Sequence, residues 1–300
     1  MNTNGHLADF LRARRGRLRP EDVGLRTYGE RRRVPGLRRE ELALLAGISA
    51  PYYARLERGE SRNASREVLD AIARALRLND SERAHLHLLA TAPSRSRTAG
   101  RPRPERVTPA TTALLAALDG TPALAIDRSG DVLAWNRQGH ALFASHLDPN
   151  SPNEPSRRPN MTALVFLDPH TRDLYADWQA KARTVVGNLR LTAGRHPEDA
   201  ALATLIGELT IRSREFAAMW ADHRIVACHV ADYEMRHPLV GTLTVTQQTL
   251  QSPQGTGPAF VMATAAPDSP SATALALLAH ATEPRDPAPA RRDTGAARTG

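Results

Sequence analysis

The chain has 300 residues, of which 41% are hydrophobic and 24% are charged, and its mean hydropathy is −0.42. This length allows two ordinary domains, and this hydropathy is typical of a soluble protein. The sequence holds no apolar run of roughly 18 residues and no apolar core near its start, so we expect neither a membrane helix nor a secretion signal. The single cysteine, Cys228, excludes an internal disulfide and a cysteine-based zinc finger. A cytoplasmic protein is expected.

The positive charge is concentrated in the first third of the chain. Residues 1–106 carry 23 arginines and 13 acidic residues, a net charge of +10, whereas residues 107–300 carry 17 basic and 19 acidic residues, a net charge of −2. Lys181 is the only lysine, so codon bias explains the preference for arginine. Codon bias does not explain the asymmetry. A localised basic surface indicates nucleic-acid binding, although a merely basic soluble domain is the simpler alternative.

Composition divides the chain into four parts. Residues 93–108 are rich in Pro, Ser, Arg and Gly without apolar periodicity, which is typical of a linker. Residues 282–300 have the composition of a disordered tail. The sequence therefore predicts a first domain over residues 1–92 and a second over residues 109–281.

The first domain shows only helical patterns. Leu7, Phe10 and Leu11 give one apolar face to a helix that ends near Gly16. Ser65 is suited to cap a second helix, and Asn79 or Asp80 a third. We therefore expect an all-helical domain.

The stretch "LRREELALLAGISAPYYARLERG", residues 37–59, predicts two short helices joined by a tight turn. Leu42, Leu45 and Ala46 lie at helical spacing in the first helix, and Gly47 ends it because glycine accepts a left-handed backbone. Ser49 is suited to cap the next helix, in which Tyr53 and Leu56 face inward. This arrangement is a helix-turn-helix.

The outer face of the second helix carries the residues that would meet DNA. The pattern leaves Ala50, Tyr52, Arg55 and Arg58 outside, and Arg55 is long enough to reach a guanine edge in the major groove. Arg38 and Arg39 start the preceding helix, where phosphate contacts are natural. A helical hairpin with a solvated arginine face is the alternative, but the basic residues lie only outside, which favours DNA binding.

The second domain mixes strands and helices. "PALAIDRSGDVLAWNRQGHALF" reads as strand, turn, strand and helix, with a turn at Ser129-Gly130-Asp131 and a helix cap at Asn136. Helical patterns follow from Met161 to about His223. Three strand-like runs come next, namely "IVACHVADY", "GTLTVTQQTL" and "AFVMATAA", before the capped helix "SPSATALALLAH". This order predicts an α+β domain.

These motifs together resemble a known family of regulators. "EELALLAGISAPYYARLERG" resembles the helix-turn-helix of the xenobiotic-response-element (XRE) class of bacterial repressors, and "RRRVPGLRREE" resembles its MmyB-like branch. The resemblance continues through "GDVLAWN", "GRHPEDAAL", "GELTIRSREFAAMW" and "RHPLVG". It implies a lambda-repressor-like first domain and a PAS-like ligand-binding second domain. It also implies DNA-facing roles for Arg39, Ser49, Ala50, Pro51, Tyr52 and Arg55.

A domain of this kind offers an apolar cavity between its sheet and helices. Aromatic residues of the second domain are the candidates for its walls: Trp135, Phe166, Tyr175, Trp178, Phe216 and Trp220. Arg212, Arg236 and His237 are candidates to meet a ligand carboxylate at its mouth. The resemblance implies a small apolar effector such as a fatty acid. For any single aromatic residue, an ordinary place in the core is the simpler interpretation.

Catalytic and metal sites have little support in the sequence. His85 and His87 are two residues apart on a helix and so point to different sides. His223, Cys228 and His229 lack a fourth ligand at motif spacing, and no nucleophile elbow, phosphate loop or dinucleotide fingerprint occurs. We therefore predict no metal, no cofactor and no enzymatic activity. A small-molecule enzyme and a protein-partner module, each fused to a helical domain, are the competing hypotheses.

The sequence thus predicts a transcriptional regulator. Its first domain would read a double-stranded DNA operator as one half of a homodimer, because one helix reads only a few base pairs. Its second domain would bind the effector and shift operator affinity through linkage.

Overall fold

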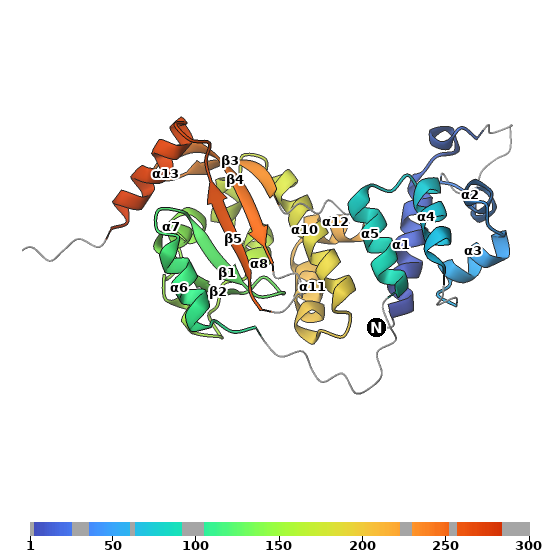
Figure 1. Ribbon diagram of the computed structural model, residues 1–300, viewed down its shortest axis with the longest axis horizontal. Coiled ribbons are helices and arrows are strands. Elements are labelled where there is room, and N and C mark those ends of the chain that lie inside the picture. The colour runs from blue at the N-terminus through green and yellow to red at the C-terminus, as the bar shows by residue number, and fades with distance from the viewer. Residues whose placement is uncertain are drawn as a thin grey trace, which may run out of the picture.

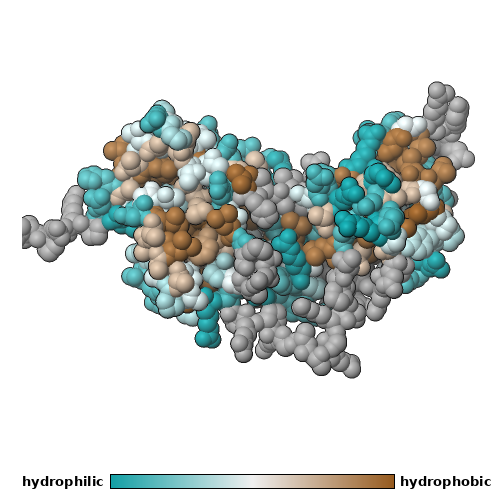
Figure 2. All heavy atoms as spheres, viewed as in Figure 1, coloured by the Kyte–Doolittle hydropathy of each residue, from teal (hydrophilic) through white to brown (hydrophobic). Residues whose placement is uncertain are grey.

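The structure is a computed structural model that describes residues 3–25, 36–60, 64–91, 105–222, 230–251 and 257–283. Its N-terminal part is helical and its C-terminal part combines a sheet with helices, as Figure 1 shows. The predicted fold class, an all-helical domain followed by an α+β domain, is confirmed. The face seen in Figure 2 mixes hydrophilic and hydrophobic patches over both domains, so hydropathy alone marks no site there.

The helices of the N-terminal domain surround one apolar core. In chain order the elements are α1 (Thr3–Arg17), the 3₁₀ turn η1 (Pro20–Val23), α2 (Arg39–Ala46), α3 (Ala50–Glu57), α4 (Arg66–Ala75) and α5 (Asp80–Thr91). Each helix contributes apolar side chains that are removed from water, including Leu11, Leu42, Tyr53, Ile72 and Leu86. Burial of these side chains is the main force that holds the short helices together.

The predicted caps form at the starts of α4 and α5. The Ser65 hydroxyl accepts a hydrogen bond from the Val68 N–H, and the Asn79 side-chain oxygen accepts one from the Glu82 N–H at 2.9 Å. The apolar residues of α2 are not all buried. Leu45 is 36% exposed, because the buried stripe of α2 runs through Leu42, Ala43 and Ala46.

The C-terminal domain begins with α6 and ends with α13. Its elements in chain order are α6 (Pro109–Ala117), β1 (Ala123–Ile126), β2 (Val132–Trp135), α7 (Arg137–Ala144), the 3₁₀ turn η2 (Ser151–Asn153), α8 (Met161–Leu167), α9 (Pro169–Leu174), α10 (Trp178–Arg195), α11 (Ala200–Arg212), α12 (Arg214–Ala221), β3 (Val230–His237), β4 (Gly241–Leu250), β5 (Ala259–Thr264) and α13 (Pro270–Ala281). This order follows the predicted succession of two strands, helices, three strands and a closing helix.

The described strands form one antiparallel sheet with the order β2-β1-β5-β4-β3. Strands β1 and β5, which are the first and last of the described strands, are therefore neighbours inside the sheet. Leu124 of β1 pairs there with Val261 of β5. The long β3–β4 hairpin pairs Val230 with Gln248 and His237 with Gly241. The face of the sheet that carries Leu243 and Val245 packs into the main core of the domain.

The third strand differs from its predicted position. The sequence pattern ended this strand at Tyr233, whereas β3 runs from Val230 to His237; residues 223–229 lie outside the described part of the chain. The strand continues because Tyr233, Met235 and His237 alternate onto the buried face. The buried His237 imidazole forms a 2.9 Å hydrogen bond with the Ala141 carbonyl, so its ring nitrogen is not left without a partner there.

Asn136 ties β1 to α7, beyond the helix cap that the sequence predicts. Its side-chain oxygen accepts hydrogen bonds from the N–H groups of Gly139 and Ala123, at 2.7 and 3.0 Å. Gly139 lies so close to Ala123 that a Cβ on Gly139 would come within 2.2 Å of the Ala123 carbonyl oxygen. The helix can approach the strand only because this residue is glycine.

Helices α10, α11 and α12 lie between the sheet and the N-terminal domain in Figure 1, and α10 contacts α5 directly. In the described ranges no helix combines the length and the apolar character that crossing a membrane requires. Helix α10 thus connects the C-terminal domain with the N-terminal domain.

Candidate DNA-binding surface and ligand cavity

The turn between α2 and α3 has the geometry that the sequence predicts. Gly47 adopts a left-handed backbone with φ +66°, and its N–H donates to the Leu44 carbonyl at 3.1 Å. The Ser49 hydroxyl accepts a hydrogen bond from the Tyr52 N–H at 3.3 Å and so caps α3. Pro51 occupies the first turn of this helix, where its missing N–H costs nothing.

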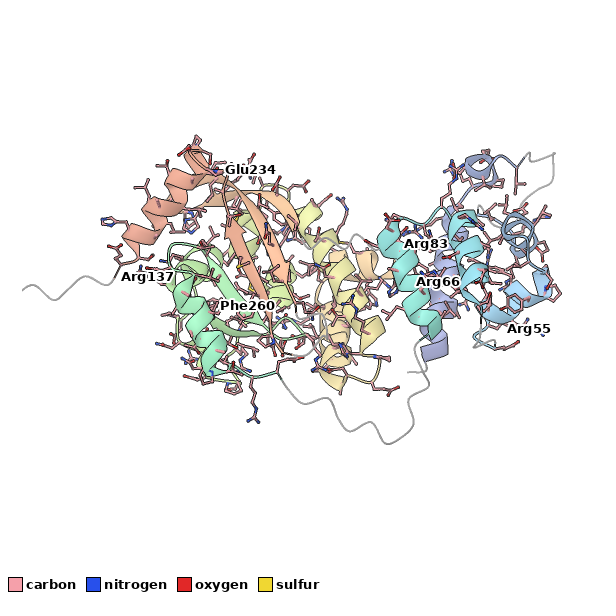
Figure 3. The ribbon with its side chains drawn as sticks, viewed as in Figure 1. Arg55, Arg66, Arg83, Arg137, Glu234 and Phe260 are labelled. Atoms are coloured by element: carbon pink, nitrogen blue, oxygen red, sulfur yellow. The ribbon has the colours of Figure 1, made fainter. Side chains whose placement is uncertain are left out.

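Helix α3 separates a buried face from an outer face. Tyr53, Leu56 and Glu57 are removed from water. The eight predicted DNA-facing residues are all at least partly accessible: Arg38, Arg39, Ser49, Pro51, Arg55 and Arg58 are exposed, and Ala50 and Tyr52 are half-buried. Figure 3 shows Arg55 extending from α3 at the far end of the N-terminal domain. The face thus presents basic and hydroxyl groups together.

The outer arginines differ in the contacts they make. The Arg55 guanidinium lies over the Tyr52 ring, 5.8 Å from its centroid. Arg58 forms two hydrogen bonds with Glu60, at 2.7 and 2.9 Å, so a neighbouring carboxylate offsets its charge. The backbone N–H of Arg38 donates to the Glu41 carboxylate at 2.7 Å, which fixes the start of α2.

Sequence reasoning missed a buried carboxylate beneath this surface. Glu57 is 1% exposed and accepts hydrogen bonds from Arg15 of α1 at 2.5 Å, Arg39 of α2 at 2.6 Å and the Tyr53 hydroxyl at 3.0 Å. Arg15 also donates to the Leu37 carbonyl at 2.6 Å. We call Glu57, Arg15, Arg39 and Tyr53 the Glu57 cluster; it joins α1, α2 and α3.

The cluster is charged in the folded protein. Burial alone would raise the pKa of Glu57, but hydrogen bonds from Arg15 and Arg39 outweigh it and hold this pKa below its usual value. Burial and the nearby Glu57 carboxylate raise the pKa of Tyr53, so its hydroxyl remains a donor. A glutamate at inward spacing beside Tyr53 was the only signal of this cluster in the sequence.

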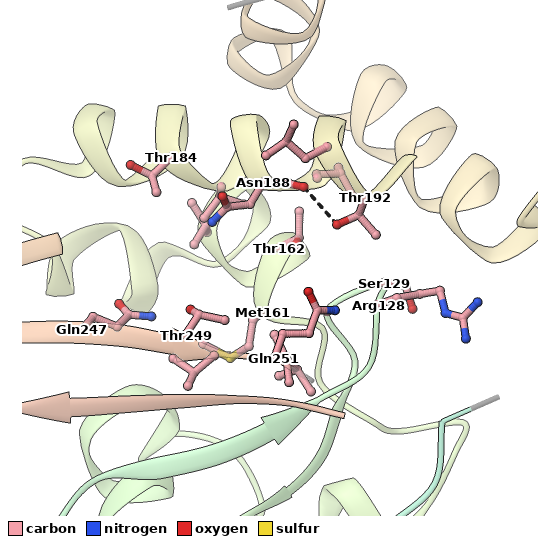
Figure 4. A pocket seen from close by; sticks show the side chains of 18 of the residues that line it. Arg128, Ser129, Met161, Thr162, Thr184, Asn188, Thr192, Gln247, Thr249 and Gln251 are labelled. Carbon is pink, nitrogen blue, oxygen red and sulfur yellow. Dashed lines mark hydrogen bonds between the residues drawn. The ribbon is translucent and has the colours of Figure 1, made fainter. Parts of the chain in front are cut away.

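A cavity of about 160 Å³ lies in the C-terminal domain, between α10 and the sheet. Figure 4 shows α10 above it, β4 below it, and the β1–β2 turn with Arg128 and Ser129 at one end. The lining residues, which mix apolar and polar side chains, are Ile126, Asp127, Arg128, Ser129, Gly130, Met161, Thr162, Val165, Lys181, Thr184, Val185, Asn188, Leu189, Leu191, Thr192, Arg195, Ala231, Tyr233, Gln247, Thr249, Gln251, Ala259 and Val261.

None of the nine predicted ligand-binding residues lines this cavity. The aromatic ones pack against one another instead. Phe216 stacks on Trp220 with ring centroids 5.6 Å apart and meets the edge of Phe166 at 5.1 Å, while the Trp178 indole donates to the Val165 carbonyl. Tyr175 contacts the ring of Tyr233, a residue of the cavity wall. Trp135 bonds to the Pro149 carbonyl at 2.8 Å.

The predicted polar residues lie apart from the cavity as well. Arg212 is exposed and pairs with Glu208 one helical turn earlier. Arg236 is exposed on β3, on the opposite side of the strand from Tyr233. His237 is buried, and its ring is occupied by the Ala141 carbonyl and the Leu239 N–H. These three side chains do not converge.

The sequence did carry a signal for the cavity. The inward positions of β4 change from Leu243 and Val245 to Gln247 and Thr249, where the strand passes under α10. On α10, lining residues recur at helical spacing through Lys181, Thr184 and Asn188. A sheet face that turns polar while it remains covered indicates a cavity.

The histidines form no metal site in the described part of the chain, where no group of three metal-ligating residues is close enough together. His85 is buried against the edge of Phe10, and His87 contacts the Asp70 carboxylate at 2.7 Å. His223, Cys228 and His229 lie outside the described residues.

Helix α10 forms a wall of the cavity and also contacts the DNA-binding domain. Leu191 lines the cavity and packs against the N-terminal core. Three residues further, Gly194 lies beside α5, where a Cβ on it would come within 2.9 Å of the His85 ring. Arg17 of α1 and Asp222, which follows α12, form an ion pair across the same junction.

A helix-turn-helix with a basic outer face, joined to an α+β domain with a cavity, is the arrangement of a DNA-binding regulator that carries a ligand-binding domain. Comparison with known families agrees. Residues 6–86 match a helix-turn-helix domain, and residues 107–278 match the MmyB-like transcription regulator ligand binding domain. The chain therefore belongs to the MmyB-like transcription regulators. It is a DNA-binding transcription regulator with a ligand-binding domain. A search of curated proteins found no match.

Proposed function

We propose that the chain is a homodimeric regulator that binds an operator with α3 in the major groove and that a small effector in the cavity changes operator affinity. A regulator of this kind meets its operator in the cytoplasm. The effector would have an apolar body, such as a fatty acid, in keeping with the family to which the chain belongs. The apolar lining of the cavity, which includes Met161, Val165 and Leu189, supports this class.

Operator reading is assigned to the outer face of α3. Arg55 is exposed on this face, with its guanidinium over the Tyr52 ring, and would reach base edges. Ser49, Ala50 and Pro51 stand at the start of the helix, whose N-terminal dipole end favours a phosphate. Arg38 and Arg58 would contact the DNA backbone, and so would Arg39 with the guanidinium nitrogens that do not bind Glu57.

One observation carries the proposed coupling, namely that α10 lines the cavity and also contacts the N-terminal domain that holds the DNA-binding surface. Leu191 and Gly194 contact the N-terminal domain, while Lys181, Asn188 and Leu191 face the cavity. A ligand that shifts α10 would change how α5 and α1 are held. The two sites would then be linked by a coupling free energy.

The test begins with selection of operator duplexes from a random DNA pool, followed by titration of the best and scrambled duplexes. Arg55→Ala should lose most of the difference between the two duplexes, because a base contact contributes about 1–3 kcal/mol of discrimination. Arg38→Ala, the matched exposed arginine, should weaken both duplexes similarly. Unchanged discrimination in Arg55→Ala would refute the assignment of α3.

The coupling is tested with whatever small molecule the purified protein carries, identified by native mass spectrometry and mass analysis after denaturation. Operator affinity is then measured with the ligand removed and restored. A change in affinity supports the proposal. Equal affinity in both states would show that the cavity does not regulate DNA binding.

A further inference from the structure

The only lysine of the chain lies buried in the wall of the cavity. Lys181 is 5% exposed, and its ammonium group donates to the Gln247 side-chain oxygen at 2.7 Å. The rings of Tyr233 and Tyr175 flank it, with centroids 4.5 and 4.9 Å from the nitrogen. Each partner is uncharged.

A buried cation without an anionic partner is costly, and natural proteins seldom retain one without a role. Among the described residues, Lys181 forms no ion pair with a carboxylate. The other charged groups that line the cavity are Asp127, Arg128 and Arg195, and they come from the β1–β2 turn and the far end of α10. Figure 4 places Arg128 at the opposite end of the cavity from Gln247, the partner of Lys181.

A second polar group in the wall has an unfilled hydrogen-bonding position. The side-chain oxygen of Asn188 is buried and accepts no hydrogen bond in the described part of the protein. Asn188 follows Lys181 by seven residues, so the two stand on one face of α10, about 10 Å apart along the helix axis. In Figure 4 Asn188 lies between Gln247 and Ser129.

We propose that Lys181 selects ligands with an acidic group, which its ammonium and the tyrosine rings enclose, and that Asn188 binds a hydroxyl group on the body of the same ligand. A hydroxyl fits Asn188 because it can donate to the amide oxygen. The ligand class is therefore a hydroxylated amphiphilic acid. This inference rests on the proposed ligand-binding role of the cavity and specifies its chemistry.

Acid binding is coupled to proton uptake above neutral pH. Burial lowers the pKa of Lys181 to about 7. An anion beside the nitrogen favours the ammonium, so binding at higher pH must first protonate the amine. Tyr175 remains neutral because burial raises the pKa of its hydroxyl.

The experiment is isothermal titration calorimetry of the full chain, stripped of bound small molecules, with four eight-carbon probes: octanoate, octyl phosphate, 1-octanol and 8-hydroxyoctanoate. At pH 6.5 we expect an acid to bind at least roughly tenfold more tightly than 1-octanol, as a charge-assisted hydrogen bond implies. Comparison of the affinities for octanoate and octyl phosphate shows whether the acidic group that the site prefers is a carboxylate or a phosphate. From pH 7 to 9 affinity for the acid should fall by about tenfold per unit, and affinity for 1-octanol should stay constant.

The decisive variant is Lys181→Met, which keeps the length of the side chain and removes its charge. It should bind acid and alcohol alike and lose the pH dependence. Arg183→Met is the matched control, because Arg183 is an exposed cation on the same helix that contacts Gln179. It should retain both properties. Lys181→Arg, which restores a cation, should regain preference for the acid.

Asn188→Leu tests the second contact. The wild-type protein should prefer 8-hydroxyoctanoate to octanoate by several-fold, and the variant should prefer octanoate. Equal binding of acid and alcohol by the wild type, preference retained in Lys181→Met, or no binding of any acid would overturn the proposal. Acid binding that depends on Lys181 but leaves operator affinity unchanged would uphold it and refute the proposed regulation instead.

Discussion

At the scale of single residues, the Glu57 cluster fixes the recognition helix. Its carboxylate receives Arg15 from α1 and Arg39 from α2, while Tyr53 and Glu57 itself belong to α3. Arg39 therefore has a structural role besides its proposed place at the DNA. Loss of operator binding in an Arg39 variant would combine both effects, which is why Arg38 is the better reference for phosphate contacts.

Replacing Glu57 should destabilise the N-terminal domain. Glu57→Gln removes the charge and leaves Arg15 without its anion, and breaking a buried ion pair typically costs about 3–5 kcal/mol. We expect the free energy of unfolding to fall by an amount near the lower end of this range, since Arg39 is half exposed. Urea unfolding at pH 7 measures it. Glu60→Gln, which breaks the exposed pair with Arg58, is the control and should change stability little. Similar losses in the two variants would contradict a structural role for the cluster.

The stabilisation by Glu57 should depend on pH. Because the folded protein holds the pKa of Glu57 below its unfolded value, the contribution is complete above that unfolded value, about 4.3, and falls as pH drops through the folded one. The difference in unfolding free energy between wild type and Glu57→Gln should therefore shrink below about pH 4. A constant difference between pH 7 and 3 would contradict this.

Lys181 should destabilise the empty protein. Its pKa is lowered to about 7 in the folded state from the ordinary 10.5, so the unfolded chain binds the extra proton between these values and stability rises with pH. The destabilisation of the folded protein by Lys181 is largest below pH 7 and disappears above about pH 10.5. Lys181→Met should raise the melting temperature at pH 6.5, and the increase should be smaller at pH 9.5. Differential scanning calorimetry measures both, and a lower melting temperature at pH 6.5 would contradict the cost of burial.

At the scale of elements, α10 is the longest helix among the described residues, and it lines the cavity at the same time as it contacts the N-terminal domain. Its Leu191 and Gly194 face the N-terminal domain at the end of the helix opposite Lys181. The absence of a side chain at Gly194 lets the His85 ring approach. Close packing of this kind transmits small shifts, because a packed interface cannot deform continuously.

Gly194→Ala should therefore weaken communication between the sites. The added Cβ would lie within 2.9 Å of the buried His85 ring, so α10 and α5 must separate. We expect a smaller effect of ligand on operator affinity, measured by fluorescence anisotropy with and without ligand. Gly207→Ala in α11 is the control, since nothing lies within 4 Å of its Cβ position. An equal ligand effect in both variants would exclude this junction as the route.

The sequence predicted the elements better than the cavity. Caps such as Ser49, Ser65 and Asn136 depend on residues three or four positions away, so local pattern was sufficient to find them. Tyr53 and Leu56 were placed correctly for the same reason. The end of β3 was missed because the burial of His237 depends on Ala141, almost a hundred residues earlier.

The cavity residues could not be found from composition. Aromatic residues were expected to line it, but Phe166, Phe216 and Trp220 pack together in the core, where their large apolar surface is best buried. Lys181 and Gln247 meet across 66 positions of sequence, and no local pattern reveals such a pair. Glu57 was missed likewise, because its partner Arg15 lies on another helix.

At the scale of the whole molecule, the placement of α3 sets the requirements for operator binding. One helix of eight residues reads only a few base pairs, so a second copy is needed for specificity. We therefore predict that the full chain binds as a dimer to an operator with two half-sites about 10 base pairs apart, or a multiple of that spacing.

Sedimentation of the protein–operator complex and hydroxyl-radical footprinting together test this prediction. The complex should have the mass of two chains plus the operator, and protection should fall in two patches separated by a whole number of helical turns. Insertion of about five base pairs between the patches should abolish tight binding, since it turns the half-sites to opposite faces of the duplex. A single protected patch with one bound chain would contradict it.

The division of α3 into two faces has an evolutionary consequence. The residues that hold the helix from inside, Tyr53, Leu56 and Glu57, are buried, while the Arg55 side chain is exposed and lies over the Tyr52 ring on the outer face. Mutations at outer positions such as Arg55 can therefore accumulate without unfolding the domain. Gene duplicates of this regulator are free to diverge toward new target promoters by a few surface substitutions, and an engineer can follow the same route to retarget it.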